Sequence, residues 1–148
     1  MAEALDLSLA GCAKVAQQRA GGLACPAIPG WFGIVIGPFD QVSRLVDESG
    51  VLKGFSRMDG AAQLSVDIAQ DKAYTAISFS MPTHAWFDFI KNDPPLLHGI
   101  VKTPRLVVFG GGYPVEIDGK IVGGIGVSGG HYSQDMKVAE AALAALKG

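Results

Sequence analysis

The sequence predicts an α/β domain of the α+β type, in which a central, mainly antiparallel sheet has helices packed on both faces. The chain of 148 residues suffices for one compact core. Amphipathic segments with helical spacing occur between short segments rich in β-branched and aromatic residues. Residues 115–122 have the pattern of a β-hairpin around Asp118-Gly119, which joins antiparallel strands. Because the sequence contains no linker and no internal repeat, we expect one domain over residues 1–148.

The first part of the chain is expected to contain one helix and two strands. Residues 4–20 place their apolar side chains at helical spacing, so we predict a helix there. Residues 31–36 and 51–58 are short and rich in residues that favour strands, and we predict a strand for each. Residues 39–50 are mixed in character and are predicted as a loop or a short helix.

Two helices are expected to follow. The first spans residues 65–80, and the second begins after Pro82, carries three aromatic side chains and ends at residues 92–95. The apolar line of the first helix consists of Val66, Ala69, Ala73, Ala76 and Ile77. Its charged residues are expected to point away from that line: Asp67, Asp71 and Lys72.

The last part of the chain is predicted to hold three strands and a helix. Residues 106–109 form a short strand that runs into Gly110–Gly112. The hairpin arms are residues 115–117 and 120–127, and a type I′ turn at Asp118-Gly119 joins them. The final helix spans residues 132–147. Its apolar side consists of Val138, Ala141, Ala142, Ala145 and Leu146.

Composition excludes several classes of protein. The net charge is −2 and no cluster of lysine or arginine occurs, so we expect no nucleic-acid partner. No apolar stretch reaches the length of a membrane span, so we expect no membrane association. The first residues lack the basic and apolar regions of a signal peptide, and Cys12 and Cys25 suit a reducing compartment. These features favour a cytoplasmic protein.

The segment Gly124-x-Gly126-x-x-Gly129 has the spacing of a dinucleotide-binding fingerprint. That fingerprint needs a βαβ unit and a later acidic residue, whereas here the preceding strand belongs to a hairpin and no strand follows the last helix. Gly124 and Gly126 instead alternate with larger residues, so one face of the strand is nearly bare. An alanine-rich helix, another subunit or a flat ligand could approach such a face closely.

Several motifs occur in a fixed order. They are Arg57-Met-Asp-Gly-Ala, Ser65-Val-Asp-Ile-Ala-x-x-Lys-Ala-Tyr-Thr-Ala, Gly110-Gly-Gly-x-Pro, and Asp118-Gly-x-x-Val-Gly-x-Ile-Gly-Val-Ser-Gly with Gln134-Asp135. Together they resemble the GlcG/HbpS family over roughly residues 51–147. This haem-binding group, also known as DUF336, includes the C-terminal domain of PduO-type cobalamin adenosyltransferases.

The resemblance implies an α/β sandwich around an antiparallel sheet, and assembly into a homo-oligomer. Some members of the family bind haem, and others are encoded among genes for the breakdown of small organic or aromatic acids. This chain departs from the family pattern in two places. Residues 25–29 and 37–41 lengthen the segment before Arg57, and His131 stands where relatives often have threonine.

His131, at the start of the last helix, is the candidate residue that could serve the largest number of chemical roles. A neutral imidazole there could act as a base, as a hydrogen-bond donor or as an iron ligand. It could equally be a capping or surface histidine. Asp135, four residues later, could orient the imidazole across one helical turn or could simply favour the helix dipole. The neighbouring Gly129 and Gly130 are expected to offer their backbone to a ligand.

Two cations and a glycine turn complete the candidate site. Family position suggests that Lys72 and Arg57 approach the glycine-rich edge, where they would suit the carboxylate of a small acid or a haem propionate. Lys72 could also be an ordinary solvated residue. The N–H groups of Gly110, Gly111 and Gly112 could hold an anion, or these residues could form a turn that needs positive φ. Asp67 and Asp71 are expected to form a salt bridge or a cap, and we predict no metal site.

These residues support two functions of different classes. The first is binding of haem or a similar flat, anionic ligand, with His131 as the candidate axial ligand and no other cofactor. The second is a cofactor-independent lyase, isomerase or tautomerase that acts on a small carboxylic or aromatic acid in a catabolic pathway. In that reaction Lys72 and Arg57 would hold the carboxylate, His131 would move the proton, and Gly110–Gly112 would stabilise the resulting oxyanion. A purely accessory subunit is a third alternative.

Overall fold

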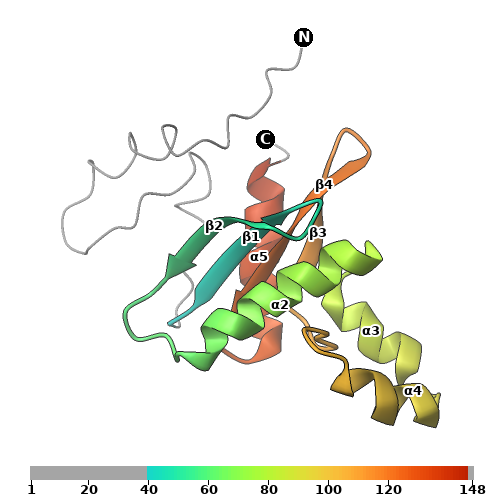
Figure 1. Cartoon of the computed structure of the whole chain (residues 1–148). Coiled ribbons are helices and arrows are strands. Elements are labelled where there is room, and N and C mark those ends of the chain that lie inside the picture. Colours follow the sequence, from blue (N-terminus) through green and yellow to red (C-terminus); the bar gives the residue numbers. More distant parts are fainter. Residues whose placement is uncertain (1–39, 147–148) are drawn as a thin grey trace, which may run out of the picture.

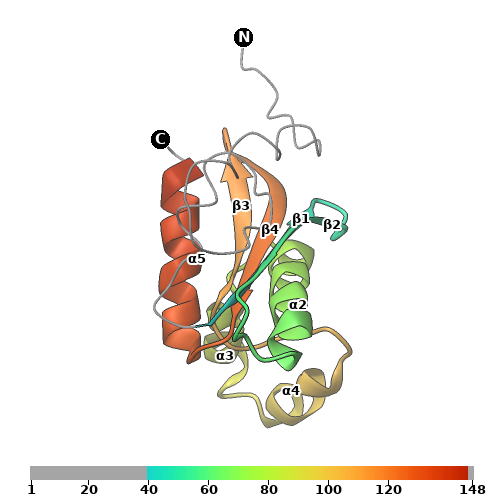
Figure 2. The same ribbon diagram turned by 90° about the vertical axis from the view of Figure 1, so that its left-hand side faces the viewer.

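Residues 40–146 are described by the structure, a computed structural model (Figure 1). Within them, four strands form one sheet in the order β2-β1-β4-β3, and all neighbouring strands are antiparallel. Helix α2 covers one face of the sheet and α5 covers the other (Figure 2), which confirms the predicted fold class. The elements are β1 (Val42–Asp47), β2 (Leu52–Arg57), α2 (Leu64–Phe79), α3 (Thr83–Ile90), α4 (Pro94–Gly99), the 3-10 helix η1 (Ile100–Lys102), β3 (Gly112–Ile117), β4 (Lys120–Ser128) and α5 (Tyr132–Leu146).

Several sequence predictions agree with these boundaries. The strand predicted over residues 51–58 corresponds to β2, and the three helices predicted after residue 64 correspond to α2, α3 and α5. The hairpin is confirmed, because Asp118 and Gly119 both have positive φ, as a type I′ turn requires. The helix predicted over residues 4–20 and the strand predicted over 31–36, with Cys12 and Cys25, lie outside the described residues.

The prediction of a loop or short helix over residues 39–50 is wrong, because β1 occupies the centre of this segment and pairs with both β2 and β4. The polar pair Ser43-Arg44 hides the strand pattern in the sequence. Arg44 is accommodated because its guanidinium donates to Gln70 at 2.7 Å and lies 4.2 Å from the centre of the Phe55 ring. An interior strand can therefore carry a cation when a helix and a neighbouring strand supply its partners.

The turn between β1 and β2 depends on the carboxylate of Asp47. Its Oδ1 accepts hydrogen bonds from the N–H groups of Ser49 at 3.0 Å and Val51 at 2.9 Å. Lys53 forms an ion pair with the other carboxylate oxygen at 3.2 Å. The bond from the Val51 backbone is the largest cause of a pKa of Asp47 that lies below its ordinary value of 3.8. The charged carboxylate is therefore the form that this turn favours.

We expect Asp47→Ala to lower the midpoint of thermal unfolding at neutral pH by more than it does in acid. Because the folded state lowers the pKa, its stabilising effect is complete above the unfolded value and disappears as the pH falls through the folded value. Thermal unfolding of both proteins between about pH 7 and pH 2 measures the difference. Glu48→Ala, an exposed change in the same turn, is the control. A gap between wild type and Asp47→Ala that is independent of pH would contradict this role.

The bare face of β4 is occupied by the alanine-rich side of α2. A Cβ atom built on Gly124 would lie 2.6 Å from the carbonyl oxygen of Ala73, and one built on Gly126 would collide with the carbonyl oxygen of Ala69. The helix backbone thus lies directly against the strand. Of the three neighbours that the glycine pattern allows, the one present at this face is a helix of the same chain.

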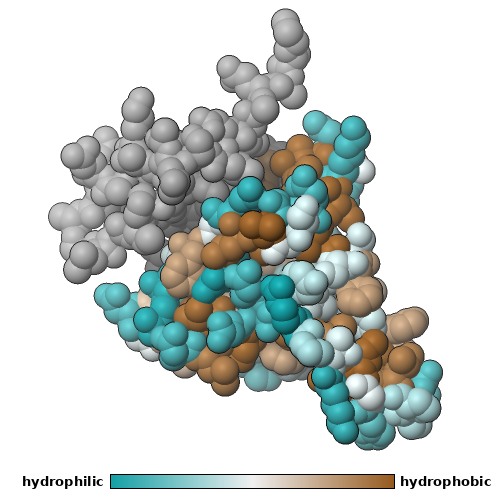
Figure 3. Space-filling view, in the orientation of Figure 1, coloured by the Kyte–Doolittle hydropathy of each residue, from teal (hydrophilic) through white to brown (hydrophobic). Residues whose placement is uncertain are grey.

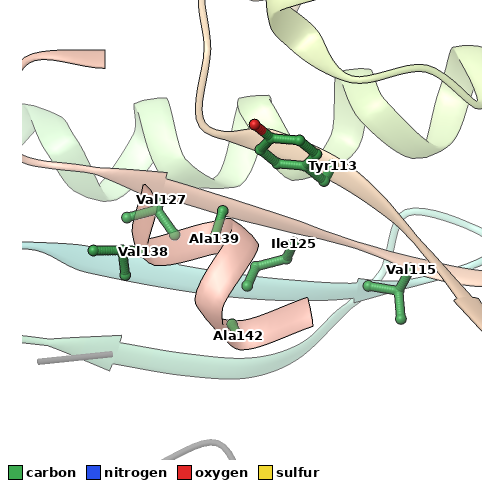
Figure 4. Packing of buried hydrophobic residues seen from close by; sticks show 7 residues of the cluster. All are labelled: Tyr113, Val115, Ile125, Val127, Val138, Ala139 and Ala142. Carbon is green, nitrogen blue, oxygen red and sulfur yellow. The ribbon is translucent and has the colours of Figure 1, made fainter. Parts of the chain in front are cut away.

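The opposite face of the sheet packs against α5. Figure 4 shows the side chains of Ile125 and Val127 directed toward this helix. The buried cluster consists of Tyr113, Val115, Ile125, Val127, Val138, Ala139 and Ala142. Val138 and Ala142 confirm the predicted apolar side of the last helix, whereas Ala141 and Ala145 are exposed and Ala139 is buried in their place.

The prediction of a strand over residues 106–109 is wrong. This segment lies against α2 and does not join the sheet. The hydroxyl of Thr75 on α2 donates to the carbonyl of Arg105 at 2.9 Å and accepts from the N–H of Val107 at 3.0 Å. A side chain of the helix thus supplies the partners that a neighbouring strand would provide. The segment ends at Gly110, close to the start of α5.

The aromatic helix α3 has one buried and one exposed side. Trp86 and Ile90 are buried, whereas Phe87 and Phe89 are 51% and 65% exposed. Asp93 follows this helix and caps α4, its carboxylate accepting from the N–H of Leu96 at 3.2 Å. Apolar side chains gather on the surface at the end of the molecule formed by α3 and α4 (Figure 3).

Candidate functional site

A buried ion pair joins the two helices that cover the sheet. The ammonium of Lys72 on α2 donates to Oδ2 of Asp135 on α5 at 2.7 Å, and the two side chains are 0% and 2% exposed. Lys72 also donates to the carbonyl of Val127 at 2.8 Å and lies 4.9 Å from the centre of the Phe109 ring. The structure thus brings together two of the predicted site residues.

The expectation that Lys72 points away from the apolar line of its helix is wrong. Lys72 is three positions after Ala69 and four positions before Ala76, and side chains at these spacings share one face of a helix. Burial lowers the pKa of the Lys72 ammonium, and the hydrogen bond and charge of Asp135 oppose that effect. A cation can lie on this apolar face because the carboxylate of Asp135, from the helix on the other face of the sheet, pairs with it.

Asp135 also connects the pair to the loop before α5. Its Oδ1 accepts from the N–H of Gly130 at 3.1 Å and from the side-chain amide of Gln41 at 3.4 Å. The carboxylate therefore bonds to these groups and to Lys72, and not to the imidazole of His131. Gln41 is completely buried, and the sequence contained no signal for its role because it precedes a strand that was not predicted.

The glycines around the pair allow close packing. Gly111 has a φ of +114°, and a Cβ there would lie 2.8 Å from Nζ of Lys72 and 2.9 Å from Cβ of Asp135. The N–H of Gly112 donates to the hydroxyl of Thr83 at 2.9 Å. Gly129 also has a positive φ and lies against the backbone of Asp40 and Gln41. These features support the prediction of a turn with positive φ at Gly110–Gly112.

His131 is exposed and precedes the first residue of α5. Its N–H donates to the side-chain carbonyl of Gln134 at 3.1 Å, which caps the helix. Its Nδ1 lies 2.9 Å from the hydroxyl of Ser133. The imidazole also lies against the ring of Tyr132, with 4.3 Å between the ring centres. The residue therefore combines the capping position with a side chain that solvent or a ligand can reach.

Three exposed rings lie close to Gly110 in sequence or in space: Phe109 precedes it, Tyr132 lies against it, and His131 packs on Tyr132. We call His131, Tyr132 and Phe109 the aromatic rim. A Cβ on Gly110 would contact the side chain of Met136 and lie 3.4 Å from the ring of Tyr132, so this turn touches the first turns of α5. Phe109 is 43% exposed and Tyr132 is 47% exposed. Phe109 lies over the ammonium of Lys72, so this member of the rim borders the buried ion pair.

Arg57 lies at the end of the edge strand β2 and does not join the buried pair. It is exposed, and its guanidinium donates to the carbonyl of Ala61 at 2.7 Å. Arg57 pairs with Val42, which pairs in turn with Ser128. Arg57 therefore lies at the same end of the sheet as the loop to His131, two strand spacings or about 10 Å across.

Other candidate residues have structural partners. Asp71 forms the predicted salt bridge, with Arg105 at 3.0 Å. Over residues 40–146, no group of three or more histidine, cysteine, aspartate or glutamate side chains is placed to hold a metal ion. In the same part of the chain, no helix has both the length and the apolar character needed to cross a bilayer.

Comparisons with known proteins point to one family. A model of the family described as haem degrading protein HbpS-like matches residues 41–144. An uncharacterized 15.0 kDa protein in the dhaT-dhaS intergenic region of Citrobacter freundii is 42% identical over 104 residues, which are 69% of this chain and 72% of that protein.

Two solved structures are similar in fold and in sequence. The crystal structure of protein ORFY of Klebsiella pneumoniae, from the DUF336 family, is 34% identical with a TM-score of 0.69, and the match covers 74% of this chain and 77% of that one. The crystal structure of a PduOC:heme complex is 36% identical with a TM-score of 0.67, and the match covers 72% of this chain and 78% of that one.

Proposed function

The chain belongs to the HbpS-like family, as its sequence motifs predicted, and from this premise we propose that it binds haem or a similar flat, anionic ligand. The ligand would lie on the aromatic rim, with His131 as the axial ligand of the iron. Because one of the similar solved structures is a PduOC:heme complex, haem is the first ligand to test. Bound haem would supply iron chemistry, whereas the chain itself would bind and orient the ring.

The geometry of His131 is the observation that carries the proposal. Its Nδ1 is engaged by Ser133, whereas its Nε2 has no hydrogen bond to any group of residues 40–146. A histidine that binds iron through Nε2 carries its ring proton on Nδ1 and donates it to a neighbour, and the hydroxyl of Ser133 at 2.9 Å is in place to accept it. Tyr132 and Phe109 add the exposed aromatic surface on which a flat apolar ring can pack.

The charged groups of such a ligand need an accessible cation. Lys72 does not meet this need, because its ammonium is completely buried and bonded to Asp135 and Val127. Arg57 is exposed at the same end of the sheet as the loop to His131. We therefore assign the propionate contact to Arg57 and give Lys72 no direct contact with the ligand.

A hemin titration followed by absorbance tests the proposal. We expect a saturable shift of the Soret band in the wild type and an affinity at least about tenfold lower in His131→Ala, because the iron loses its protein ligand. His98→Ala is the matched control, since His98 is an exposed histidine at the end of α4. Its titration should match that of the wild type.

The absence of a saturable shift in the wild type would overturn the proposal. Turnover of small carboxylic or aromatic acids would then be the next measurement, because the lyase, isomerase or tautomerase hypothesis also uses His131. The buried state of Lys72 gives that hypothesis less support, since it removes one of the two cations meant for the substrate carboxylate. Homo-oligomer formation, a cytoplasmic location and a single domain over residues 1–148 remain predictions.

A further inference from the structure

We propose that Lys72 and Asp135 are positioning residues for His131, and that neither touches the ligand. This inference rests on the proposed function, because it assigns a purpose to the loop that carries the candidate axial ligand. The buried pair would hold that loop in one conformation and so present the imidazole at a fixed place on the aromatic rim.

The carboxylate of Asp135 divides its two oxygens between different segments. Oδ2 accepts from Lys72 at 2.7 Å, and Oδ1 accepts from the N–H of Gly130 at 3.1 Å. Gly130 directly precedes His131, and the carbonyl of His131 accepts from the N–H of Asp135 at 3.2 Å. The residue with the free Nε2 is thus bounded on both sides by bonds that involve Asp135.

Lys72 contacts Phe109, the member of the aromatic rim that lies before Gly110. Its ammonium has three N–H groups, and it meets the carbonyl of Val127 at the end of β4, the carboxylate of Asp135 and the face of the Phe109 ring. One side chain of α2 therefore connects β4, α5 and the segment before Gly110. Gly111 makes this convergence possible, because any Cβ there would crowd both Nζ of Lys72 and the side chain of Asp135.

The burial of Lys72 and Asp135 indicates that they position other residues and do not contact a ligand themselves. With all of its donors directed at protein groups, Lys72 has none for a ligand. Asp135 is 2% exposed and accepts from three different donors. A group in this state can affect a ligand only through the residues that it holds, and the nearest such residues are Gly130 and Phe109.

Two double variants test this inference. Lys72→Met/Asp135→Asn removes both charges but keeps an oxygen that can accept from the N–H of Gly130. Lys72→Met/Asp135→Leu also removes both charges, has nearly the same shape, and lacks that acceptor. Because neither variant leaves an unpaired buried charge, the two differ chiefly in the hydrogen bonds that this side chain accepts from Gly130 and Gln41. Lys72→Met/Asp135→Ala replaces the leucine variant if that protein does not fold.

The first readout needs no ligand. Amide hydrogen exchange of Gly130, His131 and Ser133, followed by NMR, reports how firmly the loop is held. In the asparagine variant we expect rates close to the wild type, and in the leucine variant rates about tenfold faster, which is the typical effect of one lost hydrogen bond. Amides in the middle of β4, such as that of Ile125, should exchange equally slowly in both variants.

The second readout is hemin affinity together with the absorbance spectrum of the complex. We expect the leucine variant to bind about tenfold more weakly than the asparagine variant and to lose the spectrum of the histidine-ligated iron. Equal exchange rates at Gly130–Ser133 in the two double variants would overturn the positioning role. A wild type that does not bind hemin, combined with different exchange rates in the two variants, would reject the proposed function and retain the positioning of His131.

Discussion

Gly126→Ala is expected to lower the free energy of unfolding by about 3 kcal/mol. The added methyl group would collide with the carbonyl oxygen of Ala69 and lie 2.6 Å from the N–H nitrogen of Ala73. Both are backbone atoms of α2, so no side-chain rotation relieves the contact. The helix must move away from β4, which opens the buried layer between them. Urea unfolding followed by circular dichroism measures the change.

Gly99→Ala is the matched control for this substitution. Gly99 lies in α4, and a Cβ there would have no neighbour within 4 Å. Alanine has a higher helix propensity than glycine, so we expect unchanged or slightly increased stability. Equal effects of the two substitutions would show that Gly126 is not required for the close approach of α2.

Lys72→Met is expected to cost about 3–5 kcal/mol of unfolding free energy, the usual result of removing one partner of a buried ion pair. The loss arises because Asp135 would keep a buried carboxylate without its cation. The methionine side chain has nearly the volume of lysine, so packing alone does not account for a loss of this size. Chemical unfolding at neutral pH measures the effect.

Adding Asp135→Asn to Lys72→Met should restore most of the stability, since both charges are then absent. This recovery is the signature of a charge effect, because an effect of packing would persist or grow in the double variant. A double variant that is less stable than Lys72→Met would contradict the ion-pair explanation. Measurements on the two single variants and the double variant complete the thermodynamic cycle.

Local patterns in the sequence determined much of the fold. Asp118-Gly119 predicted its hairpin because only a few residue pairs tolerate two successive positive φ angles. Helical spacing located α2 and α5 to within a residue or two, since one buried face repeats along each helix. The ordered motifs that begin at Arg57, Ser65, Gly110 and Asp118 together identified the family, which the family model then confirmed.

The errors occurred where partners distant in sequence determine the structure. β1 contains Ser43 and Arg44, and only contacts with Phe55 and Gln70 make such a strand stable in the interior of the sheet. Residues 106–109 are rich enough in apolar side chains to suggest a strand, but the hydroxyl of Thr75 bonds to the backbone of Arg105 and Val107 at the start of this segment. In both segments the local pattern was outweighed by tertiary contacts.

The sequence by itself determined the fold class, the family and the position of His131 at the start of the last helix. Only the tertiary structure decided that Lys72 is buried, because its partner Asp135 is 63 residues away. It also decided that the bare face of β4 packs against the helix of Ala69 and Ala73. The physical reason is that helix and turn patterns are local, whereas the energy of a buried charge or a bare strand depends on what packs against it.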